Sequence, residues 1–213
     1  MALSNKLYDA IVDGKAPLAQ AIVQEELAAG ADPMALISET MIPAMDEVGK
    51  LFQEEEYFVP ELMLAGRAMK AAMEPLRPLL AAAGAKPAGV VVAGTVKGDL
   101  HDIGKNLVIS MLEGASFKVI DIGADATPQK FVEAIREHQP EIVCLSALLT
   151  VTMTAMKTTI DAIKEAGLRR SVKILVGGAP LNERYAMEIG ADGYGATATD
   201  AVALARRHLG LAN

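Results

Sequence analysis

The sequence predicts an all-α four-helix bundle over residues 1–86, followed by an α/β domain with a doubly wound parallel sheet over residues 87–213. In the first part, apolar residues recur at spacings of three and four, which is typical of amphipathic helices. After residue 89, short apolar runs alternate with amphipathic segments, as expected for a parallel sheet covered by helices on both faces. Between the two parts, residues 81–89 are rich in Ala and Gly, which indicates a linker.

The bundle is expected to contain four helices with short connections. Asp32-Pro33 is an N-cap followed by proline at the first helical position, and it should open the third helix. Pro43 should kink this helix or delay its regular start, while Pro75 and Pro78 should kink and then end the fourth. The first two helices are expected at 6–12 and 17–29, and the apolar residues of the other two cover 36–52 and 62–73.

The α/β domain is expected to contain five strands, each followed by a helix. Five parallel strands indicate a flavodoxin-like fold, whose ligand should lie at the carboxyl ends of the strands. The expected strands are 90–95, 117–122, 142–146, 173–176 and a short piece at 193–194; the expected helices are 102–112, 128–138, 152–166, 182–189 and 198–209.

Charge and composition limit the classes of function. The net charge of −7 lies in residues 1–85, which hold 13 acidic and 6 basic side chains, while the remainder is balanced. This distribution argues against nucleic-acid binding; the acidic half either steers a partner protein or is a solvated face. No apolar run approaches the roughly 20 residues of a membrane span, and the N-terminus has no signal core. The single cysteine, Cys144, is expected to be a buried strand residue. We therefore expect a cytoplasmic protein.

The stretch 94–106 combines a glycine-rich turn with a histidine at the end of the first expected strand. Its glycines, at 94, 98 and 104, do not have the G-x-G-x-x-G spacing of a dinucleotide site. A P-loop is also excluded, because five residues separate the last two glycines and asparagine follows the lysine. A nucleotide site is therefore not expected in this turn.

Asp99 stands two residues before His101, so the turn contains the parts of a metal ligand with its orienting carboxylate. No H-E-x-x-H pattern or cysteine pair supports a zinc site. A lone histidine suits a cofactor that brings its own equatorial ligands. The alternative, a structural histidine in a turn, remains open from these residues alone.

The sequence Asp99-Leu100-His101-Asp102-Ile103-Gly104 resembles the D-x-H-x-x-G motif of cobalamin-binding domains. In that family an S-x-L element and then a Gly-Gly pair follow. Here 41 residues (105–145) precede Ser146-Ala147-Leu148, and 28 more (149–176) precede Gly177-Gly178. Residues 34–76 resemble the helical cap of methionine synthase and of the small corrinoid proteins of methyltransferase systems. The resemblance therefore covers nearly the whole chain.

The resemblance implies a base-off, His-on corrinoid. His101 would be the lower axial ligand of the cobalt, and Asp99 would accept a hydrogen bond from its other ring nitrogen. In methionine synthase a serine six residues after the S-x-L serine completes this relay, and Thr152 stands at that position here. These three residues are the expected catalytic set, and His101 is the expected metal ligand.

The resemblance also implies a set of residues that surround the cofactor. Its dimethylbenzimidazole tail would enter a slot, and the bundle would shield the methyl group and swing away for a methyltransferase. The glycines have an alternative reading as plain loop residues, and the shield residues as ordinary bundle core. The expected border is Gly98, Asp102, Ile103, Gly104 and Tyr194; the slot is Ser146, Leu148, Thr150, Gly177 and Gly178; the shield is Phe58, Leu62 and Met63.

The function implied is that of a methyl carrier whose cobalamin alternates between cob(I)alamin and methylcobalamin. A donor-specific methyltransferase would deliver the methyl group of a methylamine, methanol, a betaine or an aryl methyl ether. An acceptor methyltransferase would pass it toward tetrahydrofolate or a thiol, and a corrinoid-reactivating protein would be a further partner. The alternatives are the cobalamin-binding subunit of an adenosylcobalamin mutase, against which the helical cap speaks, and a cobalamin-dependent regulator or sensor. Neither nucleic acid nor a membrane is expected as a partner.

Overall fold

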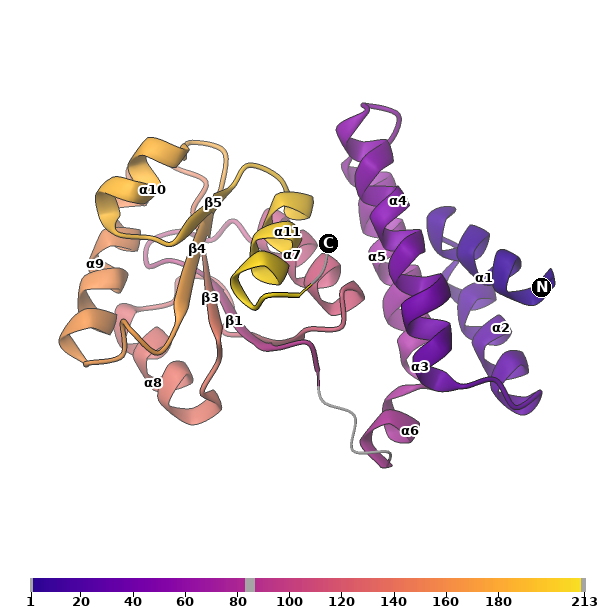
Figure 1. The fold of residues 1–213 in the computed structure, drawn as a ribbon. Helices are drawn as coiled ribbons and strands as arrows, with labels where there is room; N and C mark the ends of the chain where they lie inside the picture. Colours follow the sequence, from indigo (N-terminus) through magenta and orange to yellow (C-terminus); the bar gives the residue numbers. More distant parts are fainter. Residues whose placement is uncertain (1, 83–86, 212–213) are drawn as a thin grey trace. The chain divides into compact units, whose positions relative to one another are not determined.

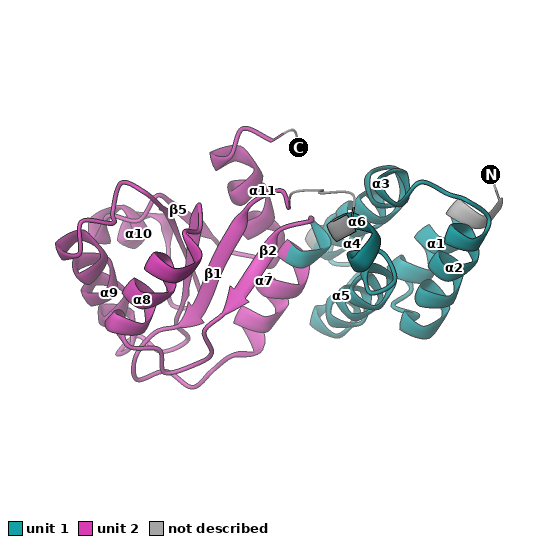
Figure 2. Cartoon of the chain, turned by 90° about the horizontal axis from the view of Figure 1, so that it is seen from below, with its two compact units in different colours: residues 1–86, 113–115 teal, residues 87–112, 116–213 magenta. Residues whose placement is uncertain are grey.

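The computed structural model describes residues 2–82 and 87–211 (Figure 1). The chain divides into two compact units, one containing residues 1–86 with 113–115 and the other containing the remainder (Figure 2). The first unit is built from helices, and the second combines a parallel sheet with helices. Within the described ranges, none of the helices combines the length and the apolar character that crossing a membrane requires.

The helical unit contains the four long helices that the sequence predicts, and the third is divided into segments. Asp32 caps its start, because its carboxylate accepts hydrogen bonds from the backbone N–H groups of Met34 and Ala35, each at 3.3 Å. A π-helical segment ends at Met41, and the regular helix begins at Ile42 with Pro43 in its first turn, which agrees with the expected delay of the regular helix. The helices are α1 (Ala2–Val12), α2 (Ala16–Ala28), α3 (Pro33–Leu36), η1 (Ile37–Met41), α4 (Ile42–Gln53) and α5 (Val59–Met73).

A further short helix, α6 (Arg77–Ala82), follows α5 and was not predicted. Pro78 lies in its first turn, where a missing N–H breaks no helical hydrogen bond. The fourth helix, α5, does end near these prolines, at Met73, but it ends before Pro75 instead of continuing through a kink to Pro78, and Pro78 belongs to a new helix. The first residues of the expected linker belong to α6, and its residues 83–86 lie outside the described residues.

The core of the helical unit is formed by apolar side chains from all four long helices. Fully buried members are Leu7 and Ile11 of α1, Val23 of α2, and Val48 of α4. Methionine contributes strongly, with three buried side chains at positions 41, 45 and 69. Methionine adapts to irregular gaps, so this core can be filled without large aromatic residues.

The second unit has the predicted five-stranded parallel sheet. Strand order is β2-β1-β3-β4-β5, the order of a flavodoxin-like fold. Helices α8, α9 and α10 cover one face, and α7 and α11 cover the other (Figure 1). The elements are β1 (Val90–Thr95), α7 (Ile103–Gly114), β2 (Lys118–Asp121), α8 (Pro128–His138), β3 (Ile142–Ser146), α9 (Met153–Glu165), β4 (Lys173–Gly177), α10 (Glu183–Ile189), β5 (Gly193–Gly195) and α11 (Ala198–His208).

The sheet positions the candidate site through its topology. The direction of winding reverses between β1 and β3, and such a reversal leaves a crevice at the carboxyl ends of the two strands. The loops that follow β1 and β3 carry the D-x-H-x-x-G and S-x-L motifs. Cys144 lies in β3, as predicted, but it is only partly buried, so the predicted burial is incomplete. Desolvation of its thiol raises its pKa to about 12.

Candidate functional site

A row of small residues crosses the carboxyl end of the sheet. Thr95 of β1 pairs with Ser146 of β3, Ser146 pairs with Gly177 of β4, and Gly177 pairs with Gly195 of β5. These adjacent register positions therefore carry little side-chain bulk at the strand ends. The S-x-L and Gly-Gly motifs, 31 positions apart from Ser146 to Gly177, thus lie beside each other.

Asp99 connects the two loops at the point where the winding reverses. Its side chain is fully buried. Oδ1 contacts Nδ1 of His101 at 2.7 Å and accepts a hydrogen bond from the His101 backbone N–H at 3.0 Å. Oδ2 accepts hydrogen bonds from the Leu148 backbone N–H and the Thr152 hydroxyl, both at 2.7 Å. One carboxylate therefore joins the loop after β1 to the loop after β3.

The hydrogen bonds keep Asp99 ionised although it is buried. Burial by itself raises the pKa of a carboxyl group, because the charged form loses its hydration. Here the donors from Thr152, Leu148 and His101 outweigh burial and hold the pKa of Asp99 well below its usual range. The stability that these bonds contribute is present above the ordinary carboxyl pKa of about 4 and is lost as pH falls through the lower, folded-state pKa. At neutral pH, Asp99 acts only as an acceptor.

Thr152 supplies a hydroxyl proton to this carboxylate. Its Oγ1 lies 2.7 Å from Asp99 Oδ2 and 2.8 Å from the Leu149 carbonyl oxygen. A hydroxyl carries one proton, and the charged acceptor gives the stronger bond. Asp99 is therefore the main acceptor.

Replacing Thr152 with alanine should lower the free energy of unfolding of the α/β unit by about 1.5–3 kcal/mol, since the bond is to a charged group. Thr152→Ser retains the hydroxyl and removes only one methyl group, so its loss should be about 0.8 kcal/mol. Urea denaturation of the cofactor-free protein, followed by circular dichroism, measures both. Equal losses in the two variants would show that the hydroxyl contributes nothing.

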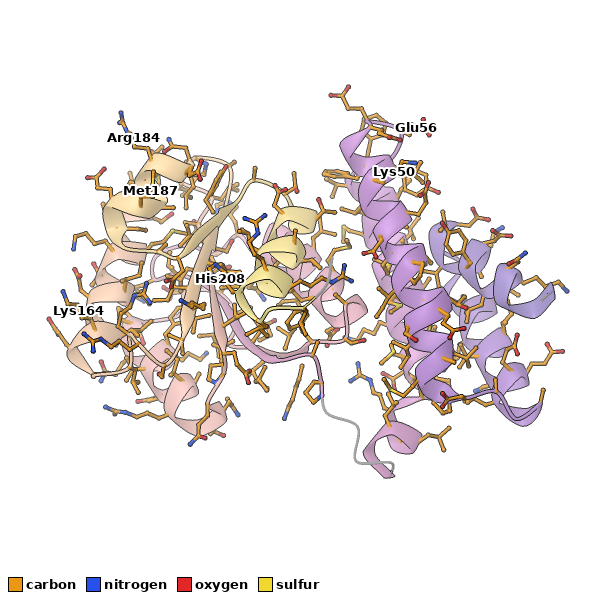
Figure 3. All side chains as sticks on the ribbon, viewed as in Figure 1. Lys50, Glu56, Lys164, Arg184, Met187 and His208 are labelled. Carbon is orange, nitrogen blue, oxygen red and sulfur yellow. The ribbon has the colours of Figure 1, made fainter. Side chains whose placement is uncertain are left out.

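The position of Asp99 determines which nitrogen of His101 is available. A carboxylate only accepts, so in the neutral imidazole Nδ1 carries the proton and Nε2 keeps its lone pair. Half of the His101 side-chain surface is exposed (50%), and Nε2 makes no hydrogen bond to any residue within 2–82 and 87–211. The other histidines, His138 and His208, lie in the last turns of α8 and α11; His208 is labelled in Figure 3.

Several apolar residues within and just after these motifs are exposed. Leu100 and Val151 each expose 75% of their surface, and Ile103 and Leu148 are also exposed. Leu148 and Val151 belong to the loop that Asp99 holds, and Leu100 and Ile103 flank His101 in sequence. Exposed apolar side chains that gather in this way mark a surface that a ligand or partner covers.

The remaining predicted site residues lie in loops, at a helix start or, in the case of Tyr194, in β5. Gly98 has a left-handed backbone with φ of 85°, and Gly104 has open space where a side chain would be. The Asp102 carboxylate accepts a hydrogen bond from Asn106 at 3.1 Å, within the start of α7. Thr150 is exposed, and Tyr194 is partly buried against the core of the α/β unit.

Glycine at positions 177 and 178 has a structural reason independent of any ligand. A Cβ at Gly178, where φ is 134°, would overlap the carbonyl oxygen of Ala147. A Cβ at Gly177 would lie 3.1 Å from the carbonyl oxygen of Gly195. The protein's own backbone requires glycine at 178 and leaves little space for a side chain at 177, which the sequence alone did not indicate.

The three expected shield residues differ in exposure. Leu62 is fully buried, as the alternative reading as bundle core requires, whereas Phe58 and Met63 are exposed. Phe58 is the N-cap residue of α5, and its backbone N–H is bound by the Glu61 carboxylate at 3.0 Å. The acidic connection before it, which includes the labelled Glu56, is exposed (Figure 3).

Two residues that contact the motif were missed from the sequence. The buried Thr95 hydroxyl donates to the carbonyl oxygen of His101 at 3.1 Å. Asp125, in the loop after β2, accepts from the backbone N–H of Gly98 at 2.8 Å. Both stand at or just after the carboxyl end of a strand, and this placement is the signal that could have identified them.

Family models match most of the chain. One described as a B12 binding domain matches residues 89–203, and a second with the same description matches residues 3–77. The first alone covers more than half of the chain, and its range includes Asp99, His101 and Thr152. The chain therefore belongs to the family of B12-binding proteins, and its cofactor is cobalamin.

Similarity to individual proteins extends over nearly the whole chain. The "Trimethylamine corrinoid protein 1" of Methanosarcina acetivorans is 43% identical over 94% of each chain. A cobalamin-binding protein of Desulfitobacterium hafniense has a crystal structure with a TM-score of 0.80, 36% identity and coverage of 96% and 98% of the two chains. The methanol:cobalamin methyltransferase complex of Methanosarcina barkeri matches with a TM-score of 0.86, 30% identity and coverage of 98% and 80%.

The residues present fit a cobalamin. A corrin supplies the equatorial ligands of its cobalt, so a protein needs to add only one axial donor. The unbonded, exposed Nε2 of His101 is a suitable donor, since imidazole nitrogen is a good ligand for transition metals. Exposed Leu148 and Val151 match the apolar surface of a macrocycle.

Proposed function

We propose that this chain is a corrinoid methyl carrier that works between two methyltransferases. The observation that carries the proposal is the hydrogen-bonded series His101–Asp99–Thr152 in a B12-binding domain. Asp99 makes a contact of 2.7 Å with His101 and another of 2.7 Å with Thr152. Support for methyl transfer comes from similar proteins that are named for trimethylamine and for a methanol:cobalamin methyltransferase complex.

In this proposal the chain's residues bind and orient, and the cofactor supplies the reactive centre. Bound cobalamin supplies a cobalt that can accept a methyl group and release it. His101 Nε2 would hold the cobalt, because Asp99 would keep the proton on Nδ1 and leave the lone pair on Nε2 free. Thr152 and the Leu148 N–H keep Asp99 charged.

The remaining predicted residues keep their proposed roles. Ser146, Leu148, Thr150, Gly177 and Gly178 form the slot for the nucleotide tail. Residues 1–86 act as a cap domain, and the exposed Phe58 and Met63 are its candidates for an apolar shield. The proposed partners are a donor-specific methyltransferase, an acceptor methyltransferase and a corrinoid-reactivating protein. Neither the mutase nor the regulator alternative is favoured by a specific observation.

Reconstitution with cobalamin, followed by a methyl-transfer assay, tests the proposal. The holoprotein is reduced with titanium(III) citrate and mixed with a methyl donor and the methyltransferase encoded beside it. The donors are tri-, di- and monomethylamine, methanol, a betaine and an aryl methyl ether. We expect one donor to produce the absorption spectrum of methylcobalamin on the protein. A chain that binds no cobalamin, or that is methylated by none of the pairs, would contradict the proposal.

A further inference from the structure

The loop after β2 also forms hydrogen bonds with the turn that contains Asp99. The backbone N–H of Asp125 donates to the carbonyl oxygen of Asp99 at 2.9 Å. The side-chain Oδ1 of the same residue accepts from the backbone N–H of Gly98 at 2.8 Å. Asp125 therefore binds the Lys97–Gly98 peptide group through its side chain and the Asp99–Leu100 peptide group through its backbone, one on each side of the Gly98–Asp99 pair.

The conformation of Asp125 is specialised for this contact. Its φ of 51° lies in the left-handed region, which Asp and Asn adopt more readily than other residues with a side chain. A parallel bridge between Val96 and Ala126 fixes the next residue of the loop. The Ala126 N–H also donates to the Thr95 carbonyl oxygen at 2.9 Å. Two successive loop residues, Asp125 and Ala126, thus bind this part of the chain through three hydrogen bonds.

The Asp125 carboxylate forms an ion pair with Lys97 Nζ, at 2.9 Å. This pair is exposed, with side-chain accessibilities of 54% and 40%, so it contributes little by itself. The hydrogen bond from the Gly98 backbone N–H to the Asp125 carboxylate is the contact that restrains the turn. Gly98 has φ of 85° and no side chain of its own to restrain it. A glycine in a turn has many alternative conformations unless another group holds it.

We infer that Asp125 is a positioning residue for the cobalt ligand: by holding the Gly98–Asp99 turn, it sets the orientation in which Asp99 presents His101. The inference rests on the proposed role of His101. Asp125 is remote from the ligand in sequence and does not contact its imidazole in any bond of the described residues. It acts through Asp99, whose carboxylate holds Nδ1 at 2.7 Å.

Asp125→Ala and Asp125→Asn separate this role from a general loss of stability. Asparagine keeps an oxygen acceptor for Gly98 and tolerates positive φ, but it loses the ion pair. Alanine loses both. Lys97→Met removes only the ion pair. Gln139→Ala is the matched control for backbone strain, since Gln139 also has a left-handed φ, of 46°, but caps α8 elsewhere.

The readout is the fraction of histidine-ligated cofactor in each variant reconstituted with methylcobalamin, measured by absorption at one pH. In Asp125→Ala the ratio of histidine-bound to histidine-free cofactor should fall about tenfold, as is usual for the loss of an orienting group. Asp125→Asn and Lys97→Met should change it by less than about fivefold, and Gln139→Ala should not change it. In the cofactor-free protein, hydrogen exchange at Gly98 should accelerate in Asp125→Ala and remain slow in Asp125→Asn.

The outcomes separate the inference from the proposed function. If the parent protein shows histidine ligation and His101→Ala lacks it, but Asp125→Ala matches the parent, the inference is overturned. An equal fall in the alanine and asparagine variants also overturns it, because charge rather than the Gly98 bond would then matter. If the parent and His101→Ala have the same spectrum, the proposed function fails instead.

Discussion

His101→Ala is expected to abolish histidine ligation of the bound corrinoid. The variant removes the only proposed axial donor, whose Nε2 is free of hydrogen bonds among the described residues. Loss of an outer orienting group costs 10–100-fold in metal affinity, so loss of the ligand itself should reduce the affinity for methylcobalamin by at least about 100-fold. Equilibrium dialysis measures the affinity, and the absorption spectrum of the bound cofactor reports the ligand.

The other two histidines provide matched controls. His138 and His208 lie in the last turns of α8 and α11, and their alanine variants should bind methylcobalamin with the parent spectrum. Asp99→Asn is the complementary variant, because an amide can still contact the imidazole but carries no charge to fix the tautomer. We expect its spectrum to lie between the parent and His101→Ala. A histidine-ligated spectrum in His101→Ala would refute the assignment.

Gly178→Ala is expected to destabilise the α/β unit severely. A Cβ at this position overlaps the Ala147 carbonyl oxygen, and the backbone φ of 134° is one that side-chain-bearing residues rarely adopt. The clash involves backbone on both sides, so no rotamer change can relieve it. We expect the free energy of unfolding to fall by about 3 kcal/mol or more.

Gly167→Ala separates the clash from the backbone strain. Gly167 is also left-handed, with φ of 75°, but no atom lies within 4 Å of a Cβ placed there. Its alanine variant should lose only the strain of the left-handed conformation, about 1–2 kcal/mol. Urea denaturation of both cofactor-free variants gives the comparison. Equal losses would mean that the loop containing Ala147 moves freely, and that the slot is less rigid than the contacts indicate.

The sequence predicts most of the fold because its signals are local. Apolar spacing places the helices and strands, and the expected bounds of α8 agree with the observed Pro128–His138. The prolines were harder to interpret. Pro43 delays a helix as expected, whereas Pro78 starts one, because proline is compatible with a first turn and incompatible with a helix interior.

The sequence by itself determined the class of protein, since the D-x-H-x-x-G motif and its separations from S-x-L and Gly-Gly are properties of the linear sequence. Only the tertiary structure decided which atoms hold the motif. Asp99 binds Thr152 at 53 residues' distance in sequence, and Asp125 reaches the same turn from 27 residues away. These contacts depend on strand order and parallel register, which bring the carboxyl ends of β2, β1 and β3 together. Apolar periodicity fixes where a strand lies in the chain, but not which strand end becomes its neighbour.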